Sequence, residues 1–277
     1  MSIVRVLASE FLKVTTTRMW WLLAIIMFAY LAFTAGGLGA LFGFTIANPE
    51  AAAATGTEAP PIGGAQLAPL VYSFATSLGY VFAVIIGVLA VTGEFRHRTL
   101  TATFLATPQR TSVLAAKLVA QLPIGAGFGV IAFLGTVGAG AAMLAAFGLD
   151  PMLDQSDTWA MVGRGILAMA LWAAIGAALG SVVPNQVAAI VIVLAFTQFV
   201  EPLLRLAASF SDVTSSIGKF LPGAASDALV GASFYSLATP GGAAQSLDWW
   251  QGGLVLFGIA VVLAAIGAAT SWRRDVS

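Results

Sequence analysis

The chain has no cysteine and only one histidine, His97, among its 277 residues. The absence of cysteine excludes disulfides, thiolate metal sites and cysteine nucleophiles, and a lone histidine argues against histidine-rich metal clusters and histidine-based catalysis. Charge is scarce as well, because 12 basic and 12 acidic residues make up only 9% of the chain, against roughly 25% in a soluble domain. So few charges cannot cover a soluble globule, which excludes a soluble enzyme, a nucleic-acid-binding protein and a disordered chain.

Long apolar runs are abundant instead, since 59% of the residues are hydrophobic. A membrane-spanning helix needs about 20 mainly apolar residues. The third stretch of this length, at about residues 113–147, is longer than one straight crossing requires, so we expect it to tilt or to project into water. The sequence predicts one all-α polytopic membrane domain over residues 1–277, with six transmembrane helices at about residues 19–44, 66–92, 113–147, 159–183, 187–210 and 249–271.

The basic residues predict the orientation, because cytoplasmic loops are enriched in lysine and arginine. We expect both termini in the cytoplasm and the first span to act as an uncleaved anchor in the plasma (inner) membrane. This orientation places nine of the 12 basic residues on the cytoplasmic side: Arg5, Lys13, Arg18, Arg96, Arg98, Arg110, Lys117, Arg273 and Arg274.

Three further segments lie outside the spans. Residues 1–18 are predicted to form an amphipathic helix at the inner interface, in contact with membrane lipid; its marker residues are Arg5, Glu10, Phe11 and Lys13. Residues 48–65 are small, acidic and rich in proline and glycine, which predicts a flexible outer loop. Residues 211–247 hold two apolar pieces too short to cross, which favours short outer or re-entrant helices over a plain loop.

The main charged segment between spans, residues 93–112, lies between the second and third stretches. It predicts a short helix at Leu100–Ala106 that ends before Pro108, because proline interrupts a helix. Leu100 and Phe104 are four residues apart and share one face of this helix. Such a helix, rimmed by arginine, can lie on lipid headgroups or insert into a groove on a soluble partner.

The same segment carries a resemblance to a known family. VTGEFRHRTLTATFLATPQRTSVLAAKL (91–118) and SEFLKVTTTRMWWLL (9–23) resemble the ABC-2 type permeases, the membrane subunits of ATP-driven exporters, and their actinobacterial branch above all. The resemblance covers nearly the whole chain. It implies a dimer of permeases, a homodimer more readily than a heterodimer, with two copies of a cytoplasmic ABC ATPase. It also implies that the amphipathic helix and the 93–112 region dock on the ATPase, through Glu94, Arg96, Arg98, Leu100, Phe104 and Arg110.

The chain itself is expected to be a transport subunit and no enzyme. Its three lysines, Lys13, Lys117 and Lys219, follow no phosphate-binding GxxxxGK[ST] loop. ATP and Mg²⁺ therefore belong to the partner ATPase, and no cofactor or metal is expected in this chain. A mostly apolar path suits a hydrophobic or amphiphilic cargo, such as a drug, a lipid or a peptide antibiotic, and multidrug efflux is one form of such export.

Charges within the predicted spans mark a second candidate site. Arg164 in the fourth span and Glu201 in the fifth are placed at similar depth below the outer surface, where they could meet, and Arg205 lies one turn beyond Glu201. Pro202 is expected to kink the fifth span. Because an unpaired charge inside a membrane is costly, these residues predict either an ion pair that braces two spans or a gate on the export path.

Two other classes of function stay open. An ATPase-independent secondary transporter or channel would show several acidic residues at mid-span or matching broken helices in two halves, and the sequence has Glu201 and no clear repeat. A non-transporting membrane scaffold would share the fold and recruit no ATPase.

Overall fold

The structure is a computed structural model of the chain, and it describes residues 3–54, 56, 64–97, 99–106, 109–208, 212–233 and 247–272. Within these ranges every regular element is a helix. Six helical segments are long and apolar enough to cross a membrane. The predicted all-α, multi-pass architecture is therefore confirmed.

The spans match the predicted stretches closely. They are α2 (Met19–Ala47), α4 with α5 (Gly64–Ser77 and Tyr80–Arg96), α7 (Arg110–Ala146), α8 (Ser156–Val182), α9 with η1 and α10 (Gln186–Ala195, Phe196–Val200 and Glu201–Ala208), and α13 (Trp249–Ala269). The shorter helices are α1 (Ile3–Thr15), α3 (Pro49–Ala54), α6 (Leu100–Ala106), α11 (Asp212–Gly218) and α12 (Pro222–Val230).

Two predictions need correction. The segment 48–65 is not a loop throughout, because α3 occupies Pro49–Ala54 and α4 begins at Gly64, while residues 55 and 57–63 lie outside the described residues. The second span is not one helix but two, which meet at Leu78 and Gly79. The 211–247 segment does contain two short helices, α11 and α12, and residues 234–246 lie outside the described residues.

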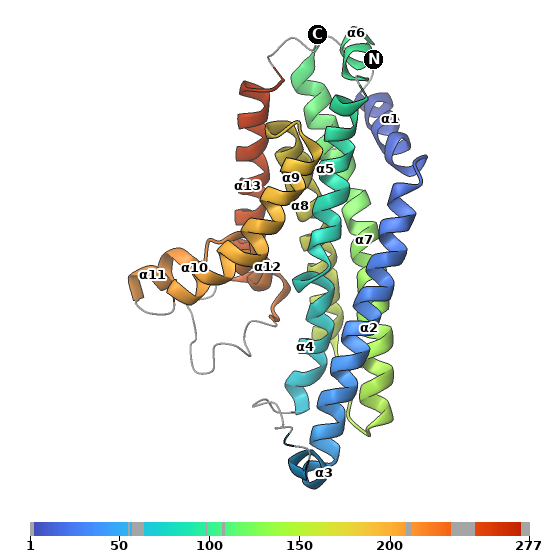
Figure 1. Cartoon of the computed structure of the whole chain (residues 1–277), viewed down its shortest axis with the longest axis vertical. Coiled ribbons are helices and arrows are strands. Elements are labelled where there is room, and N and C mark those ends of the chain that lie inside the picture. Colours follow the sequence, from blue (N-terminus) through green and yellow to red (C-terminus); the bar gives the residue numbers. More distant parts are fainter. Residues whose placement is uncertain are drawn as a thin grey trace.

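The long helices α2, α4 with α5, α7 and α8 run side by side along the longest axis of the molecule (Figure 1). At one end lie α1, α6 and the last turn of α13, and we call it the α6 end. At the opposite end lie α3 and the connection between α7 and α8, and we call it the α3 end. The helices α9 and α13 extend from the α6 end only part of the way, and α10, α11 and α12 lie at mid-height (Figure 1).

The centre of the bundle is α8, whose most apolar stretch is 78% buried, against 17% for the Gln186–Ala208 segment. It contacts α5, α7 and α13. The crossing with α5 is closest at Gly176, where an added Cβ would collide with the carbonyl of Val84, and at Gly87, where one would collide with the carbonyl of Ala173. Glycine at both positions lets the two backbones approach, a common way to pack helices in membranes.

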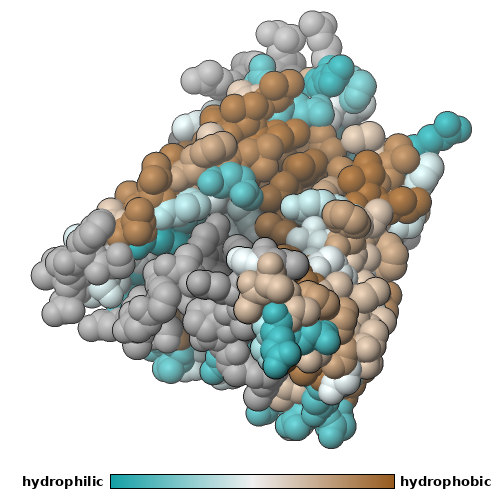
Figure 2. Space-filling view, turned by 60° about the horizontal axis from the view of Figure 1, so that its bottom comes forward, coloured by the Kyte–Doolittle hydropathy of each residue, from teal (hydrophilic) through white to brown (hydrophobic). Residues whose placement is uncertain are grey.

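The flank of the bundle is apolar. Figure 2 shows hydrophobic side chains over much of the visible surface, with hydrophilic ones gathered in smaller groups. Large apolar side chains on different spans are exposed there, including Phe33 of α2, Val187 of α9 and Phe257 of α13. A soluble protein rarely exposes so much contiguous apolar surface, which agrees with spans that face lipid.

Candidate functional site

Four charged side chains from three helices meet at the α6 end, and we call them the ion cluster: Glu10 and Lys13 of α1, Glu94 of α5 and Lys117 of α7. The Nζ of Lys117 lies 2.5 Å from Oε2 of Glu10 and 2.7 Å from Oε1 of Glu94. The Nζ of Lys13 lies 2.6 Å from Oε1 of Glu10 and 2.8 Å from the same Glu94 oxygen. Each ammonium therefore contacts both carboxylates.

Most of the ion cluster is removed from water. Lys117 is 1% exposed, Glu10 5% and Glu94 8%, and the two positive charges balance the two negative ones. Lys13 is the member open to solvent. Burial disfavours its ammonium, but its hydrogen bonds to Glu10 and Glu94 outweigh this and raise the pKa of Lys13 above its ordinary value. A balanced, hydrogen-bonded cluster of this kind fixes α1 against α5 and α7.

Lys117 is not among the residues that the sequence predicts for a functional site. The signal was present, because Lys117 stands alone in the apolar run VLAAKLVAQL, and a buried charge at a span end needs a partner. By sequence it belongs with the cytoplasmic charges. In the structure its ammonium is buried and paired with the carboxylates of Glu10 and Glu94.

The short helix α6 is held against the bundle by Trp272, which follows α13. The ring of Phe104 lies 5.3 Å from the indole, and the ring of Phe95 lies 6.4 Å from it at a near right angle. Arg110 Nη1 donates to the carbonyl of Trp272 at 3.0 Å, and its guanidinium carbon lies 4.9 Å from the centre of the Phe104 ring. Leu100 is fully buried in the same apolar group. The helix α6 therefore packs against α5, α7 and the end of α13.

This geometry corrects one prediction about α6. Its bounds are those predicted, but Leu100 is buried and Phe104 is partly buried, because both pack on the bundle. Among the α6 side chains that the structure describes, Leu105 is the most exposed, at 81%. Among the predicted docking residues, Arg96 is exposed at the end of α5, and Arg98 lies outside the described residues.

The helix α1 is present over the predicted range, yet one of its predicted interfacial residues is buried. Phe11 is exposed on the surface, as expected of a side chain that faces lipid. Glu10 instead points into the ion cluster, because the charges of Lys13 and Lys117 meet it there. The side chain of Arg5 lies outside the described residues.

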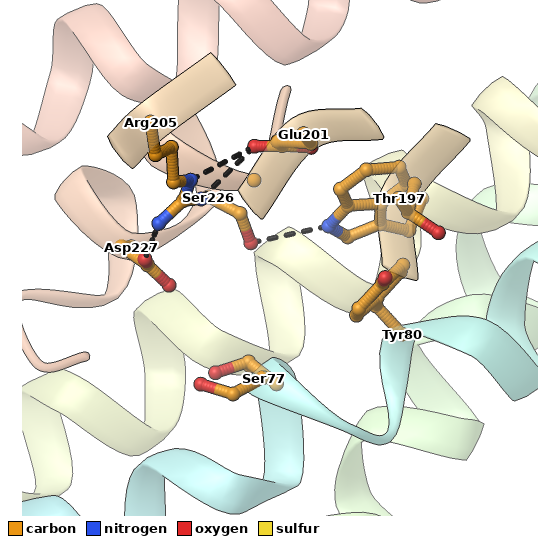
Figure 3. Close-up of a pocket in the computed structure, with 10 residues that line it drawn as sticks. Ser77, Tyr80, Thr197, Glu201, Arg205, Ser226 and Asp227 are labelled. Carbon is orange, nitrogen blue, oxygen red and sulfur yellow. Dashed lines mark hydrogen bonds and ion pairs between the residues drawn. The ribbon is translucent and has the colours of Figure 1, made fainter. Parts of the chain in front are cut away.

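The second candidate site joins α10 to α12 (Figure 3). Arg205 donates from Nε and Nη2 to Oε1 of Glu201 at 3.1 and 3.0 Å, and from Nη1 to Oδ2 of Asp227 at 2.7 Å. Glu201 Oε1 also accepts the backbone N–H of Ala224, in the first turn of α12, at 3.1 Å. Burial raises the pKa of Asp227, against the opposing effects of Arg205 and of the Ser233 hydroxyl, which donates to it.

The predicted pairing of Arg164 with Glu201 is wrong. Arg164 donates from Nε to the carbonyl of Ala160 on its own helix, and its guanidinium lies against Gly231, the residue that ends α12. Glu201 therefore sits at the start of α12 and Arg164 at its end. A negative charge at a helix N-terminus and a positive one at a C-terminus both complement the helix dipole. The sequence indicates only that the two residues lie at similar depth, and it gives no sign that α12 lies between them.

The predicted kink at Pro202 is confirmed. Residues Phe196–Val200 form a π-helical turn directly before α10, and α10 then leaves the line of α9 and runs outward (Figure 1). Proline lacks the N–H that would continue the ladder, and π-turns are a recognised cause of helix bending. The bend carries Glu201 and Arg205 to α12.

A small cavity lies between these helices. Tyr80, Thr197 and Ser77 line it together with the charged residues of α10 and α12 (Figure 3). Its volume is about 20 Å³, which is room for about one water molecule, whereas sites for drug-sized ligands measure roughly 300–1,000 Å³. In this conformation the cavity cannot hold such a cargo, and its polar groups serve to connect α10 with α12.

No protein-family model matches the sequence, and no curated protein matches it either. Among the described residues, no three His, Cys, Asp or Glu side chains gather as metal ligands would. The resemblance to ABC-2 permeases stays a prediction from residues 9–23 and 91–118. The structure adds the contacts through which α1 and α6 are attached to the spans.

Proposed function

We propose that the chain is the transmembrane subunit of an ATP-binding-cassette exporter. A second permease, most simply another copy of this chain, completes the translocation path. Two copies of a separate ATPase supply ATP and Mg²⁺ and drive the cycle. The cargo is hydrophobic or amphiphilic, in line with the apolar character of the spans.

One observation carries the proposal: the two elements that the resemblance assigns to ATPase docking, α1 and α6, are both attached to the same two spans. The ion cluster joins α1 to α5 and α7. The contacts of Phe104 and Arg110 join α6 to Trp272 and to the start of α7. A push on either element at the α6 end is therefore transmitted to α5 and α7 together.

The membrane placement belongs to the same proposal. The α6 end is cytoplasmic and the protein lies in the plasma membrane, with both termini inside. In this placement α1 lies in the inner interface, α6 is the coupling helix, and α11 and α12 are outer or re-entrant helices. Arg96, exposed at the end of α5, and Leu105, exposed on α6, are then the residues that meet the ATPase.

Co-purification tests this proposal. The tagged chain is co-expressed with a candidate ATPase, purified in detergent and assayed for bound ATPase and for ATP hydrolysis. Leu105→Asp is expected to abolish recruitment, because it places a charge at the exposed apolar contact, and to leave the thermal unfolding midpoint of the chain unchanged. Leu153→Asp, at a half-exposed leucine near the α3 end, is the matched control and is expected to retain the complex.

Two results would contradict the proposal. A chain that never recruits an ATPase but transports in liposomes would favour the secondary transporter or channel. A chain that neither recruits an ATPase nor transports, while it holds another membrane protein in a complex, would favour the scaffold.

A further inference from the structure

A large groove lies at the α6 end between the start of α7 and the end of α13. Its volume is about 660 Å³, within the range of sites for drug-sized molecules. The two helices barely touch each other, since α13 packs mainly on α8 and α12. The groove is lined by Arg110, Thr111, Leu114, Ala265, Ala268, Ala269 and Trp272.

Two of the lining residues, Arg110 and Trp272, carry hydrogen-bond donors. Trp272 is only 3% exposed, and its indole N–H is buried and has no hydrogen-bond partner among the residues that the structure describes. A buried donor without an acceptor is rare in folded proteins and calls for an explanation. Arg110 adds a permanent positive charge beside it, since its guanidinium is bonded to the carbonyl of Trp272.

Apart from Thr111, the rest of the described lining is apolar. Ala265, Ala268 and Ala269 form the wall on α13, Leu114 lies on α7, and none of the described residues that line the groove is acidic. Beside it, Val261, Val262 and Ile266 of α13 are exposed on the apolar flank. In the sequence Arg273 and Arg274 follow Trp272 directly, which adds positive charge to this part of the chain.

We propose that this groove binds an acidic phospholipid from the leaflet at the α6 end. The phosphate oxygens accept hydrogen bonds from the Trp272 indole and from Arg110, and an acyl chain lies along the alanines of α13. An anionic head with an apolar tail satisfies the unpartnered donor, the positive charge and the apolar wall at once. The proposal does not depend on an ATPase, because binding is a property of the purified chain.

Native mass spectrometry of the full chain in detergent tests the groove. Dioleoylphosphatidylglycerol is expected to be retained, and dioleoylphosphatidylcholine, with its zwitterionic head, much less. Trp272→Phe keeps an aromatic side chain but loses the indole N–H together with part of the ring system, and it is expected to weaken retention about tenfold, the effect of losing a hydrogen bond to a charged acceptor. Arg110→Gln is expected to weaken it at least as much.

Two variants separate the groove from general charge attraction. Ala265→Phe adds an apolar side chain at an exposed alanine, leaves every charge in place, and is expected to abolish retention by filling the groove. Arg18→Gln removes an exposed positive charge at the start of α2 and is expected to change retention less than twofold. Excess soluble glycerol phosphate is expected not to displace the lipid.

Four outcomes overturn the proposal. Equal retention of the two lipids would show that the net negative charge of the headgroup is not selected. Equal loss in Arg18→Gln and Arg110→Gln would show that any positive charge at this end suffices. Unchanged retention in Ala265→Phe would place the lipid elsewhere, and displacement by glycerol phosphate would identify the site as one for a free phosphate ester.

Discussion

Lys13 of α1 and Glu94 of α5 are 81 residues apart in the sequence, and the Nζ of the first lies 2.8 Å from Oε1 of the second. The same carboxylate oxygen also meets Lys117. This oxygen is the point at which the amphipathic helix, the end of the second span and the start of the third converge. The three elements are therefore expected to move as one body.

Removing Lys117 is expected to cost more stability than removing any exposed charge. Lys117→Met leaves the carboxylates of Glu10 and Glu94 buried with only Lys13 to compensate them, which costs about 3–5 kcal/mol. Chemical unfolding of the purified protein in detergent measures the loss. Arg18→Met is the control, since its charge is exposed, and it is expected to stay within about 0.5 kcal/mol of the unchanged chain. Similar losses in the two variants would mean that the ion cluster contributes nothing.

A double-mutant cycle distinguishes the observed charge pairing from the predicted one. Arg205→Gln and Asp227→Asn are expected to be coupled by about 0.5–3 kcal/mol, because the two side chains are in direct contact. Arg164→Gln and Glu201→Gln are expected to add within about 0.5 kcal/mol, because they lie at opposite ends of α12. Strong coupling of Arg164 with Glu201 would instead support the predicted ion pair between the fourth and fifth spans.

The glycines of α8 are expected to differ sharply in their tolerance of alanine. Gly176→Ala places a methyl group against the carbonyl of Val84 and is expected to separate α5 from α8. Overpacking of this kind costs about 1–3 kcal/mol. Gly163→Ala, on the same helix, meets no atom within 4 Å and is expected to be neutral or slightly stabilising. Thermal unfolding midpoints in detergent measure both, and a loss of stability in Gly163→Ala would point to helix backbone effects rather than to the crossing.

The contribution of Lys13 to the attachment of α1 is expected to be lost only in strong alkali. Because the pKa of Lys13 is raised in the folded protein, its contribution is fully present below the unfolded value of about 10.4 and is lost as the pH rises through the higher folded value. Glu94→Gln removes one of the two carboxylates and is expected to move this loss to lower pH. The unfolding midpoint measured from pH 7 to 11 shows the effect, and a loss centred near pH 8 in the unchanged chain would be inconsistent with it.

The sequence was most informative where one local rule decides the structure. The helix Leu100–Ala106 has its predicted bounds because Pro108 and the spacing of Leu100 and Phe104 leave little choice. The break at Leu78 and Gly79 was missed, since the apolar run continues through it and hydropathy alone does not register a local break. Glycine at position 79 was a weak signal, because most glycines in these spans lie within unbroken helices.

The candidate sites were predicted less well, because pairing depends on the third dimension. Depth along a helix placed Arg164 near Glu201, but depth does not say which side of α12 each residue occupies. Asp227 lies in one of the two short apolar pieces of the 211–247 segment, yet it is the partly buried partner of Arg205. A polar residue inside an otherwise apolar segment, such as Lys117 or Asp227, is the signal that could have found both sites.

The unequal lengths of the spans have a consequence for the surrounding membrane. At about 1.5 Å per residue, the 37 residues of α7 extend for about 55 Å and the 21 residues of α13 for about 32 Å. A bilayer of uniform thickness matches α13, whereas α7 has to tilt, project into water or thicken the bilayer beside it. Shorter or longer acyl chains then favour different tilts of the whole bundle. The length of the lipid chains therefore influences how far the α3 end projects from the membrane.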